Sequence, residues 1–441
     1  MNYTLMHKNI EVAEIEIDSA TGIVSAIGAV KNAEHFPIGT VVNYGKDSGT
    51  PRRDWFNEWW LGRSIPPSRI GIKNALADMG VYSSKLLLEK CKGLSLSDQY
   101  WIRPFGSNET WDEVNFFTND FAKDVGEILF GHAPDNPNAI NLMSPDNTSV
   151  GWHRKRWFIV EGKRFLLKGG EGVFRQEPFN EVIASEIMRR LGVSHIDYSI
   201  VSEGGKAYSI CENFVSVDTE LIPAYHIIES HRKNDNDSKL AHLIHSCEAL
   251  GMPNVEQDIC KMIVVDYIIA NTDRHNTNYG FIRNAETLEW QGFAPIFDSG
   301  SSLWYDTADV GSEVDCMPFR EKHDDQIKLV KDFTWFDFEA LSGIKGFIAD
   351  TFINSPNIDS ARARAIAGAV YNRAAIVAEL AKGRSLYEIK GRSFRVKTFT
   401  APQKKEPQSI SEYIQNVKER RESGETKLPK PPIKKKSHER D

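Results

Sequence analysis

One stretch of the chain constrains its fold more than any other. The strongly apolar residues 255–270 run directly into the polar sequence NTDRHNTNYG. The apolar run predicts a buried helix, and a loop that begins where a buried helix ends is held in place by rigid structure. Residues 279–283 and 290–296 then predict a short hairpin that ends in FDSGSS. The polar side chains of these two loops are therefore the first candidates for a functional site.

Three of these side chains have the chemistry of a phosphoryl-transfer site. Asp273 is followed five residues later by Asn278, and Asp298 lies twenty residues further on. Asn278 and Asp298 offer oxygen ligands to Mg²⁺, which proteins hold with one or two carboxylates while substrate phosphates complete the coordination. Asp273 is then left to accept a proton from an incoming hydroxyl. Such residues also cap helices and close turns, but capping accounts poorly for the combined spacing.

A cation and an acid precede these loops at the expected places. Residues 156–168 predict a β-hairpin that ends in Lys168, and residues 177–192 predict a helix that carries Glu181 near its start. Phosphoryl transfer requires a cation on the α- and β-phosphates and an acid on a helix to hold that cation. Glu186, one turn later, is a competing partner for Lys168.

The segment before the hairpin, SPDNTSVGWHRKRW, is the candidate phosphate loop. It contains one glycine, Gly151, and does not match GxGxxG. Backbone N–H groups in a turn bind phosphate without that pattern, and Ser149 and His153 add side-chain donors together with Arg154 and Lys155. A plain surface turn remains the alternative.

The sequences NTDRHNTNYGFI and PIFDSGSS resemble the catalytic and metal-binding segments of the HipA-like Ser/Thr kinase family. Phosphoinositide kinases share a similar DRHxxN loop, so the signal is specific for kinase-like phosphoryl transfer and less so for the acceptor. The resemblance covers about residues 144–385. It implies that Asp273 is the catalytic base and that Asn278 and Asp298 bind the metal. The DFG-like element reads Asp-Ser-Gly here.

The resemblance implies further site residues and the ligands ATP and Mg²⁺. Lys168 and Glu181 would form the nucleotide-positioning pair. His275 would orient the catalytic loop by hydrogen bonding rather than bind metal. The remaining expected nucleotide contacts lie in the phosphate loop and at the hinge after the strand 207–214, where the backbone meets adenine: Ser149, Gly151, His153, Glu212 and Phe214. Candidates for autophosphorylation, by position only, are Ser144, Thr148 and Ser149.

The implied fold is α+β: a bilobal protein-kinase-like fold with additions at both ends. We expect an N-terminal accessory domain of unknown role over residues 1–140, with three tryptophans in its core (Trp55, Trp59 and Trp60). A mixed β/α N-lobe over 141–222 and a mainly helical C-lobe over 223–395 follow. The tail, 396–441, is rich in lysine and proline and is expected to be flexible, with one short amphipathic helix.

The charge and cysteine content of the chain argue against several classes of function. Residues 401–441 carry eleven Lys/Arg against seven Asp/Glu, so the first 400 residues have a formal charge of −11 within a total of −7. An acidic body argues against direct nucleic-acid binding except through the tail. Five scattered cysteines without CxxC exclude a disulfide scaffold. No segment predicts a signal peptide or a membrane span, so the expected location is cytoplasmic.

Three functions remain open. The first is a Ser/Thr protein kinase acting on a protein hydroxyl, and the resemblance implies for it a role as the toxin of a toxin–antitoxin module, with a small DNA-binding antitoxin as partner. The second is a lipid or small-molecule kinase with the same catalytic loop, because that loop says little about the acceptor. The third is a catalytically degenerate kinase-fold binding module.

Overall fold

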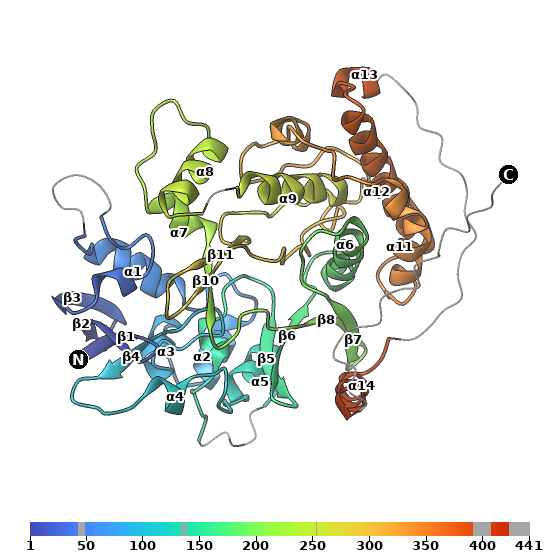
Figure 1. The fold of residues 1–441 in the computed structure, drawn as a ribbon. Coiled ribbons are helices and arrows are strands. Elements are labelled where there is room, and N and C mark those ends of the chain that lie inside the picture. Colours follow the sequence, from blue (N-terminus) through green and yellow to red (C-terminus); the bar gives the residue numbers. More distant parts are fainter. Residues whose placement is uncertain (43–48, 134–135, 137–138, 253, 391–406, 423–441) are drawn as a thin grey trace.

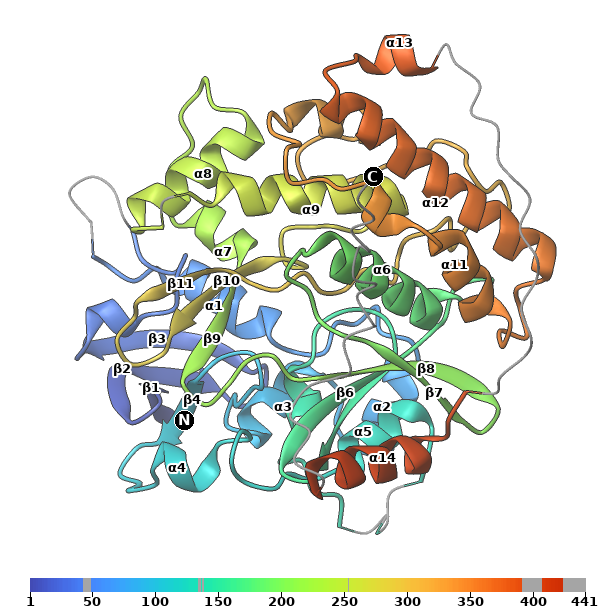
Figure 2. The ribbon, with the colours of Figure 1, turned by 45° about the vertical axis from the view of Figure 1, so that its right-hand side comes forward.

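The computed structural model describes residues 1–42, 49–133, 136, 139–252, 254–390 and 407–422. The architecture is mixed α+β, as predicted, with three antiparallel sheets. Figure 1 shows the N-terminal sheet and a second sheet, formed by strands within residues 155–212, lying below a group of helices. Figure 2, turned by 45°, shows the same arrangement.

The N-terminal part is a four-stranded sheet in the order β3-β2-β1-β4, covered by short helices. Apolar and acidic residues alternate along most of β2, and all but the first of its apolar side chains are buried. Trp59 and Trp60 are buried in the core, as expected, but Trp55 is only half-buried, with Arg52 over its ring. The elements are β1 (Asn2–His7), β2 (Ile10–Asp18), β3 (Ile23–Val30), α1 (Arg53–Gly62), α2 (Ile72–Asp78), α3 (Lys85–Lys90), β4 (Tyr100–Pro104), α4 (Trp111–Val114) and α5 (Asp124–Phe130).

The second sheet has the order β5-β6-β8-β7 and carries helix α6. The predicted hairpin is confirmed, and its turn residues Glu161 and Gly162 both have positive φ, of 51° and 74°, as a two-residue turn that follows strand twist requires. The predicted helix ends at Gly192 in the left-handed conformation. The elements are β5 (Lys155–Val160), β6 (Lys163–Gly169), α6 (Glu177–Leu191), β7 (Ser199–Glu203) and β8 (Lys206–Glu212).

The remainder is mainly helical around a small sheet of order β11-β10-β9. The predicted buried helix is α9, whose residues from Met262 to Ile269 are all buried. The elements are β9 (Thr219–Pro223), α7 (Ala224–Glu229), α8 (Lys239–Ala249), α9 (Glu256–Ile269), β10 (Gly280–Asn284), β11 (Trp290–Phe293), α10 (His323–Gln326), α11 (Ile344–Phe352), α12 (Ser360–Ala381) and α13 (Leu386–Lys390).

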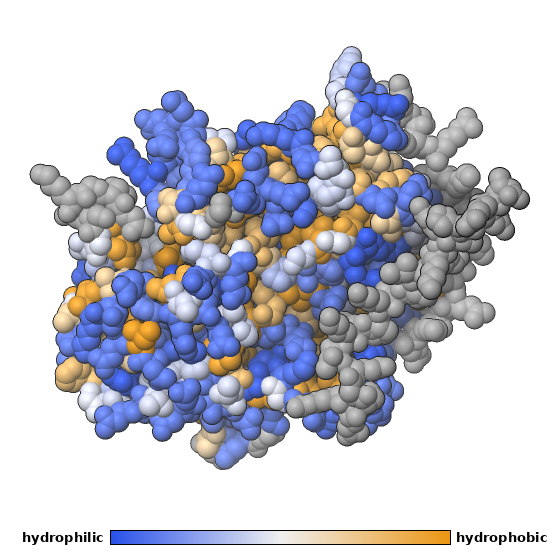
Figure 3. Space-filling model, viewed as in Figure 1, coloured by the Kyte–Doolittle hydropathy of each residue, from blue (hydrophilic) through white to orange (hydrophobic). Residues whose placement is uncertain are grey.

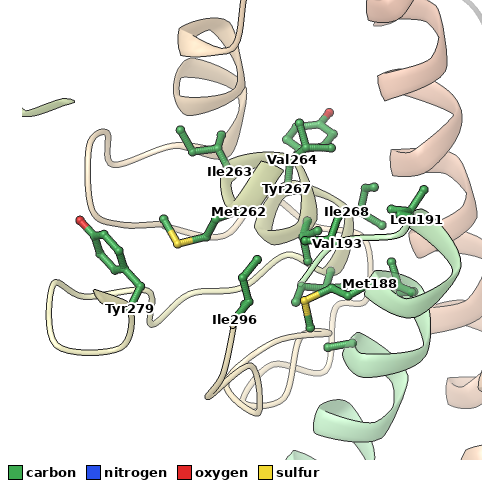
Figure 4. Close-up of a cluster of buried hydrophobic side chains, with 14 of the residues drawn as sticks. Met188, Leu191, Val193, Met262, Ile263, Val264, Tyr267, Ile268, Tyr279 and Ile296 are labelled. Atoms are coloured by element: carbon green, nitrogen blue, oxygen red, sulfur yellow. The ribbon is translucent and has the colours of Figure 1, made fainter. Parts of the chain in front are cut away.

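The largest hydrophobic core joins α6 to α9 and α12. Figure 4 shows Met188 and Leu191 of α6 facing Ile268 of α9, with Ile296 from the strand end nearby. Burial of such side chains contributes about 1.5–3 kcal/mol each. This core therefore holds α6, which carries Glu181, and α9, which leads into the NTDRHNTN loop, in a constant relation. Hydrophilic residues cover most of the face in Figure 3, and every helix among the described residues is too short or too polar to cross a bilayer.

The C-terminal segment differs in part from the expected flexible tail. The short amphipathic helix is present as α14 (Ile410–Glu422). Its apolar residues Ile410, Tyr413, Ile414 and Val417 pack against the second sheet because their spacing places them on one helix face. Figure 2 shows α14 in front of that sheet. The rest of the predicted tail, including its lysine run, lies outside the described residues.

A buried polar cluster joins the N-terminal part to the small C-terminal sheet. Glu220 on β9 pairs with Arg283 on β10 at 2.6 Å and with His7 on β1 at 3.1 Å. The Arg283 guanidinium also donates to the Tyr100 hydroxyl at 3.3 Å. Burial alone would raise the pKa of Glu220, but the charges of His7 and Arg283 outweigh it and lower that pKa to about 2.

We predict that Glu220→Ala lowers the free energy of unfolding by about 3–5 kcal/mol, because it leaves Arg283 buried without a carboxylate. Lys31→Ala, which removes the exposed Lys31–Glu11 pair, should cost less than about 1 kcal/mol. Urea denaturation measures both. The folded pKa lies below the unfolded value of about 4.3, so the contribution of Glu220 is present above that pH and is lost as the pH falls toward 2. Equal losses in the two variants would contradict this assignment.

Candidate active site

The Lys168 ammonium bridges two carboxylates from distant parts of the chain. Lys168, near the end of β6, lies 2.9 Å from Glu181 of α6 and 2.9 Å from Asp298 in the FDSGSS loop. Its Nζ also donates to the Tyr198 hydroxyl at 3.3 Å. Burial opposes the charged form, but Asp298 and Glu181 outweigh it and raise the pKa of Lys168 well above its usual value. The site therefore contains a permanent, oriented cation.

The competing acid for Lys168 forms its ion pairs with other residues. Glu186 pairs with Arg189 and Arg190, at 2.6 Å for the latter. Glu181 instead lies inward, and its second carboxylate oxygen accepts the backbone N–H of Ser299 at 2.8 Å. The helix acid thus binds both the cation and the loop that follows Asp298.

A buried arginine ties the two loops together. Arg274, which is completely buried, forms an ion pair with Asp266 of α9 at 3.0 Å. The same guanidinium donates to the carbonyl of Asn278 at 2.8 Å and to the Ser299 hydroxyl at 3.0 Å. It also donates to the carbonyl of Phe297. The loop after α9 and the loop after β11 are therefore held to one another by a single side chain.

The loop after α9 presents Asp273 beside a histidine. His275 lies 3.9 Å from the Asp273 carboxylate, and its other ring nitrogen is 2.7 Å from the Thr277 hydroxyl. Burial raises the pKa of Asp273, and the negative charge of Asp298 adds to this, while His275 opposes it. His275 is thus placed to orient the loop, and Asp273 is a carboxylate whose affinity for a proton is increased.

Asn278 and Asp298 both offer a free oxygen toward the same cavity. The Asn278 amide nitrogen donates to the carbonyl of Asp273 at 2.8 Å. Within the described residues nothing donates to the Asn278 side-chain oxygen, and only Lys168 donates to the Asp298 carboxylate. Burial would raise the pKa of Asp298, but Lys168 and Lys155 lower it strongly, so this carboxylate is ionised.

These donors fit a hard cation. In the described part of the chain, His, Cys, Asp and Glu form no group of three or more suited to a metal. A cation here would therefore bind the Asp298 carboxylate, the Asn278 amide oxygen and oxygen atoms of a bound substrate. Proteins hold Mg²⁺ in this way together with phosphates.

A cavity of about 450 Å³ lies between the second sheet and the loops. Lys168, Asn278 and Asp298 line it, as do the expected hinge residues Glu212 and Phe214. Glu212 is exposed and pairs with Lys163 at 2.8 Å. The cavity continues to side chains of the N-terminal part, among them Trp59, Arg63, Asp98 and Tyr100.

The candidate phosphate loop forms one wall of this cavity. Ser149 lines it, and Gly151 has a φ of 94°, with so little space that an added Cβ would lie 2.8 Å from the Lys155 ammonium. His153 stacks beside Trp152, with ring centroids 3.9 Å apart, and burial lowers its pKa to about 4. The three autophosphorylation candidates, Ser144, Thr148 and Ser149, are buried.

Sequence reasoning missed several groups at this site. Tyr198 contacts Lys168, and Arg274 binds both loops. A tyrosine in a strand region and an arginine in a loop carry no distinctive sequence signal. Burial lowers the pKa of Lys155 to about 7. The only sequence signal for Arg274 is its place between Asp273 and His275 in the DRH motif.

One family model matches the part of the chain that carries these loops. The family model described as the HipA-like C-terminal domain matches residues 149–376. The match covers more than half of the chain, which therefore belongs to this family.

The chain is similar in sequence to a curated kinase. The Helicobacter pylori serine/threonine-protein kinase CtkA is 29% identical over 140 residues, which are 30% of this chain and 42% of the relative. The chain thus matches less than half the length of this curated relative. The crystal structure of the H. pylori proinflammatory kinase CtkA has a TM-score of 0.40 and 18% identity, over 53% of this chain and 94% of that chain.

A further structure extends the likeness toward the N-terminus. A chain of the Shewanella oneidensis complex of HipA, HipB and operator DNA has a TM-score of 0.54 and 13% identity, over 86% of this chain and 99% of that one. Residues 141–441 make up only about two thirds of the chain. The shared fold therefore includes part of the first 140 residues, which the sequence had not shown.

We predict that Asp266→Ala lowers the free energy of unfolding by about 3–5 kcal/mol, because Arg274 is then buried without a carboxylate. Asp273→Ala, which removes a partly exposed carboxylate from the same loop, serves as the control and should cost less. Chemical denaturation of both variants tests this. A smaller loss for Asp266→Ala than for Asp273→Ala would contradict the role given to Arg274.

Proposed function

We propose that the protein is an ATP- and Mg²⁺-dependent Ser/Thr protein kinase of the HipA-like type. The observation that carries this proposal is the Lys168 ammonium held between Glu181 and Asp298 at 2.9 Å each, on the wall of a cavity that Asn278 also lines. A cation, a metal-binding pair and a carboxylate near the metal site are the parts that phosphoryl transfer needs. The bilobal description, with lobes at 141–222 and 223–395, belongs to the same proposal.

Each residue has a defined role in the proposed reaction. Lys168, oriented by Glu181, binds the α- and β-phosphates. Mg²⁺ bound by Asn278 and Asp298 would neutralise charge on the phosphates. Asp273 accepts the proton of the acceptor hydroxyl while the hydroxyl oxygen bonds to the γ-phosphorus. The bond from that phosphorus to the bridging oxygen breaks, and ADP leaves. His275 keeps Asp273 in place.

The outer parts of the cavity suit the rest of the nucleotide. Glu212 and Phe214 lie at the end of β8, where the adenine would meet the backbone. Ser149 lines the cavity, and Gly151 and His153 follow it in the loop that would face the phosphates. Lys155 adds a second ammonium, since both Lys155 and Lys168 line the cavity.

The acceptor is proposed to be a protein hydroxyl, as the name of the curated relative CtkA indicates for that kinase. A small DNA-binding antitoxin is the proposed partner, by analogy with the HipA–HipB–operator assembly. A cytoplasmic location is part of this proposal. A lipid or small-molecule acceptor is the competing outcome, and a binding module without turnover is the other.

We predict that Asp273→Asn and Asp298→Asn each reduce phosphate transfer by at least about a hundredfold, because proton acceptance and metal binding are removed. Labelled ATP is incubated with the protein and a lysate, and transfer to protein, lipid and small-molecule fractions is counted. Asp309→Asn, at an exposed loop position, is the control and should remain active. Undiminished transfer by both site variants would reject the catalytic assignment, and label in lipid alone would establish the lipid kinase.

We also predict an acid limit of activity above the usual carboxyl range. Asp273 must be ionised to accept a proton, and burial raises its pKa from an ordinary value of about 3.9. Activity should therefore fall as the pH decreases through this raised value. The pH profile of kcat/KM for ATP measures it, with His275→Gln expected to move the limit further upward because the positive partner is lost. A profile with no acid limit would argue against Asp273 as the base.

A further inference from the structure

Arg69, a residue of the N-terminal part, binds backbone carbonyl groups of the candidate phosphate loop. Arg69 donates to the Gly151 carbonyl at 2.9 Å, to the Ser149 hydroxyl at 2.9 Å and to the Ser149 carbonyl. The next residue, Ile70, donates its N–H to the Trp152 carbonyl at 3.3 Å. Arg69 is almost completely buried. Arg69 and Ile70 therefore bind carbonyl groups of the loop from Ser149 to Trp152.

Peptide geometry determines what the other side presents. In a trans peptide the C=O and the N–H of the same unit point in opposite directions. The units whose carbonyls face Arg69 and Ile70 carry the N–H groups of Val150, Trp152 and His153. In the described chain these three N–H groups have no hydrogen-bond partner. They consequently point away from Arg69, and unpaired N–H groups of neighbouring residues are a recurrent anion-binding device.

The charges around this loop favour an anion as well. Ser149 and Val150 line the same cavity as Lys155 and Lys168. Arg69 forms no ion pair with any described residue, because its contacts are a hydroxyl and carbonyls. The loop therefore lies between the buried Arg69 guanidinium and the Lys168 ammonium of the cavity, and such an arrangement raises the local concentration of anions.

We infer that Arg69 is a positioning residue of the nucleotide site, which binds the carbonyl side of residues 149–152 and thereby presents the N–H groups of Val150, Trp152 and His153 to the phosphates of ATP. This inference rests on the proposed function, because the phosphates are those of the proposed substrate. Arg69 lies outside the matched residues 149–376. The first 140 residues, whose role the sequence left open, thus contribute to nucleotide binding.

The test compares ATP with adenosine, which lacks the phosphates. Both ligands are titrated calorimetrically into the full-length protein and into Arg69→Met. The affinity for ATP should fall on the order of tenfold or more, because several charge-assisted hydrogen bonds are lost, while the affinity for adenosine should stay unchanged. In kinetic assays the KM for ATP should rise more than kcat falls. Arg69→Lys keeps the charge but cannot span both carbonyls, so an intermediate loss is expected.

Controls separate this role from a structural one. Arg103→Met removes another arginine of the N-terminal part, which pairs with Glu11 on the sheet surface, and should bind ATP like the unaltered protein. Thermal melting checks that each variant is folded. Parallel loss of ATP and adenosine in Arg69→Lys, or unchanged ATP affinity in both Arg69 variants, would overturn the inference. If the folded, unaltered protein binds adenosine but gains nothing from the phosphates, the proposed function itself fails.

Discussion

The arrangement of the site depends on one buried cation. Removing an ammonium from water is costly unless carboxylates compensate, and Lys168 is compensated by Glu181 and Asp298. These two acids come from a helix and from a loop that are far apart in the sequence, so the charge of Lys168 requires α6 and the FDSGSS loop to lie on the same side of the second sheet. A neutral residue at this position would leave two carboxylates facing each other.

A second buried charge, that of Arg274, holds the two loops beside the cavity in fixed positions. Arg274 is paired with Asp266 on the most buried helix and reaches the backbone of both loops. Donors and acceptors that are held in place before a ligand arrives need little reorganisation when charge develops. The rigidity of the hydrophobic core around α9 is thus transmitted to Asp273 and Asn278 through one guanidinium.

The N-terminal part is integrated with the rest rather than appended to it. Glu220, Arg283 and His7 form a buried cluster across its boundary, and Arg69 reaches the loop beside the cavity. The sequence suggested an accessory domain because no local motif marks these contacts. The His7–Glu220 and Arg69–Ser149 contacts join residues that are 213 and 80 positions apart, and a single histidine or arginine carries no sign of such a partner.

Local pattern and motif spacing determined much of this protein. The hairpin that carries Lys168, the helix that carries Glu181 and the buried helix before Asp273 follow from periodicity and turn chemistry, which act over a few residues, whereas the α+β class was implied by the resemblance of the catalytic segments. The tertiary structure alone decided that Glu181 rather than Glu186 meets Lys168, that part of the tail is a packed helix, and that Arg69 and Arg274 hold the loops. Those outcomes depend on burial of charges between segments distant in the chain, and the cost of leaving such a charge unpaired is a property of the folded interior.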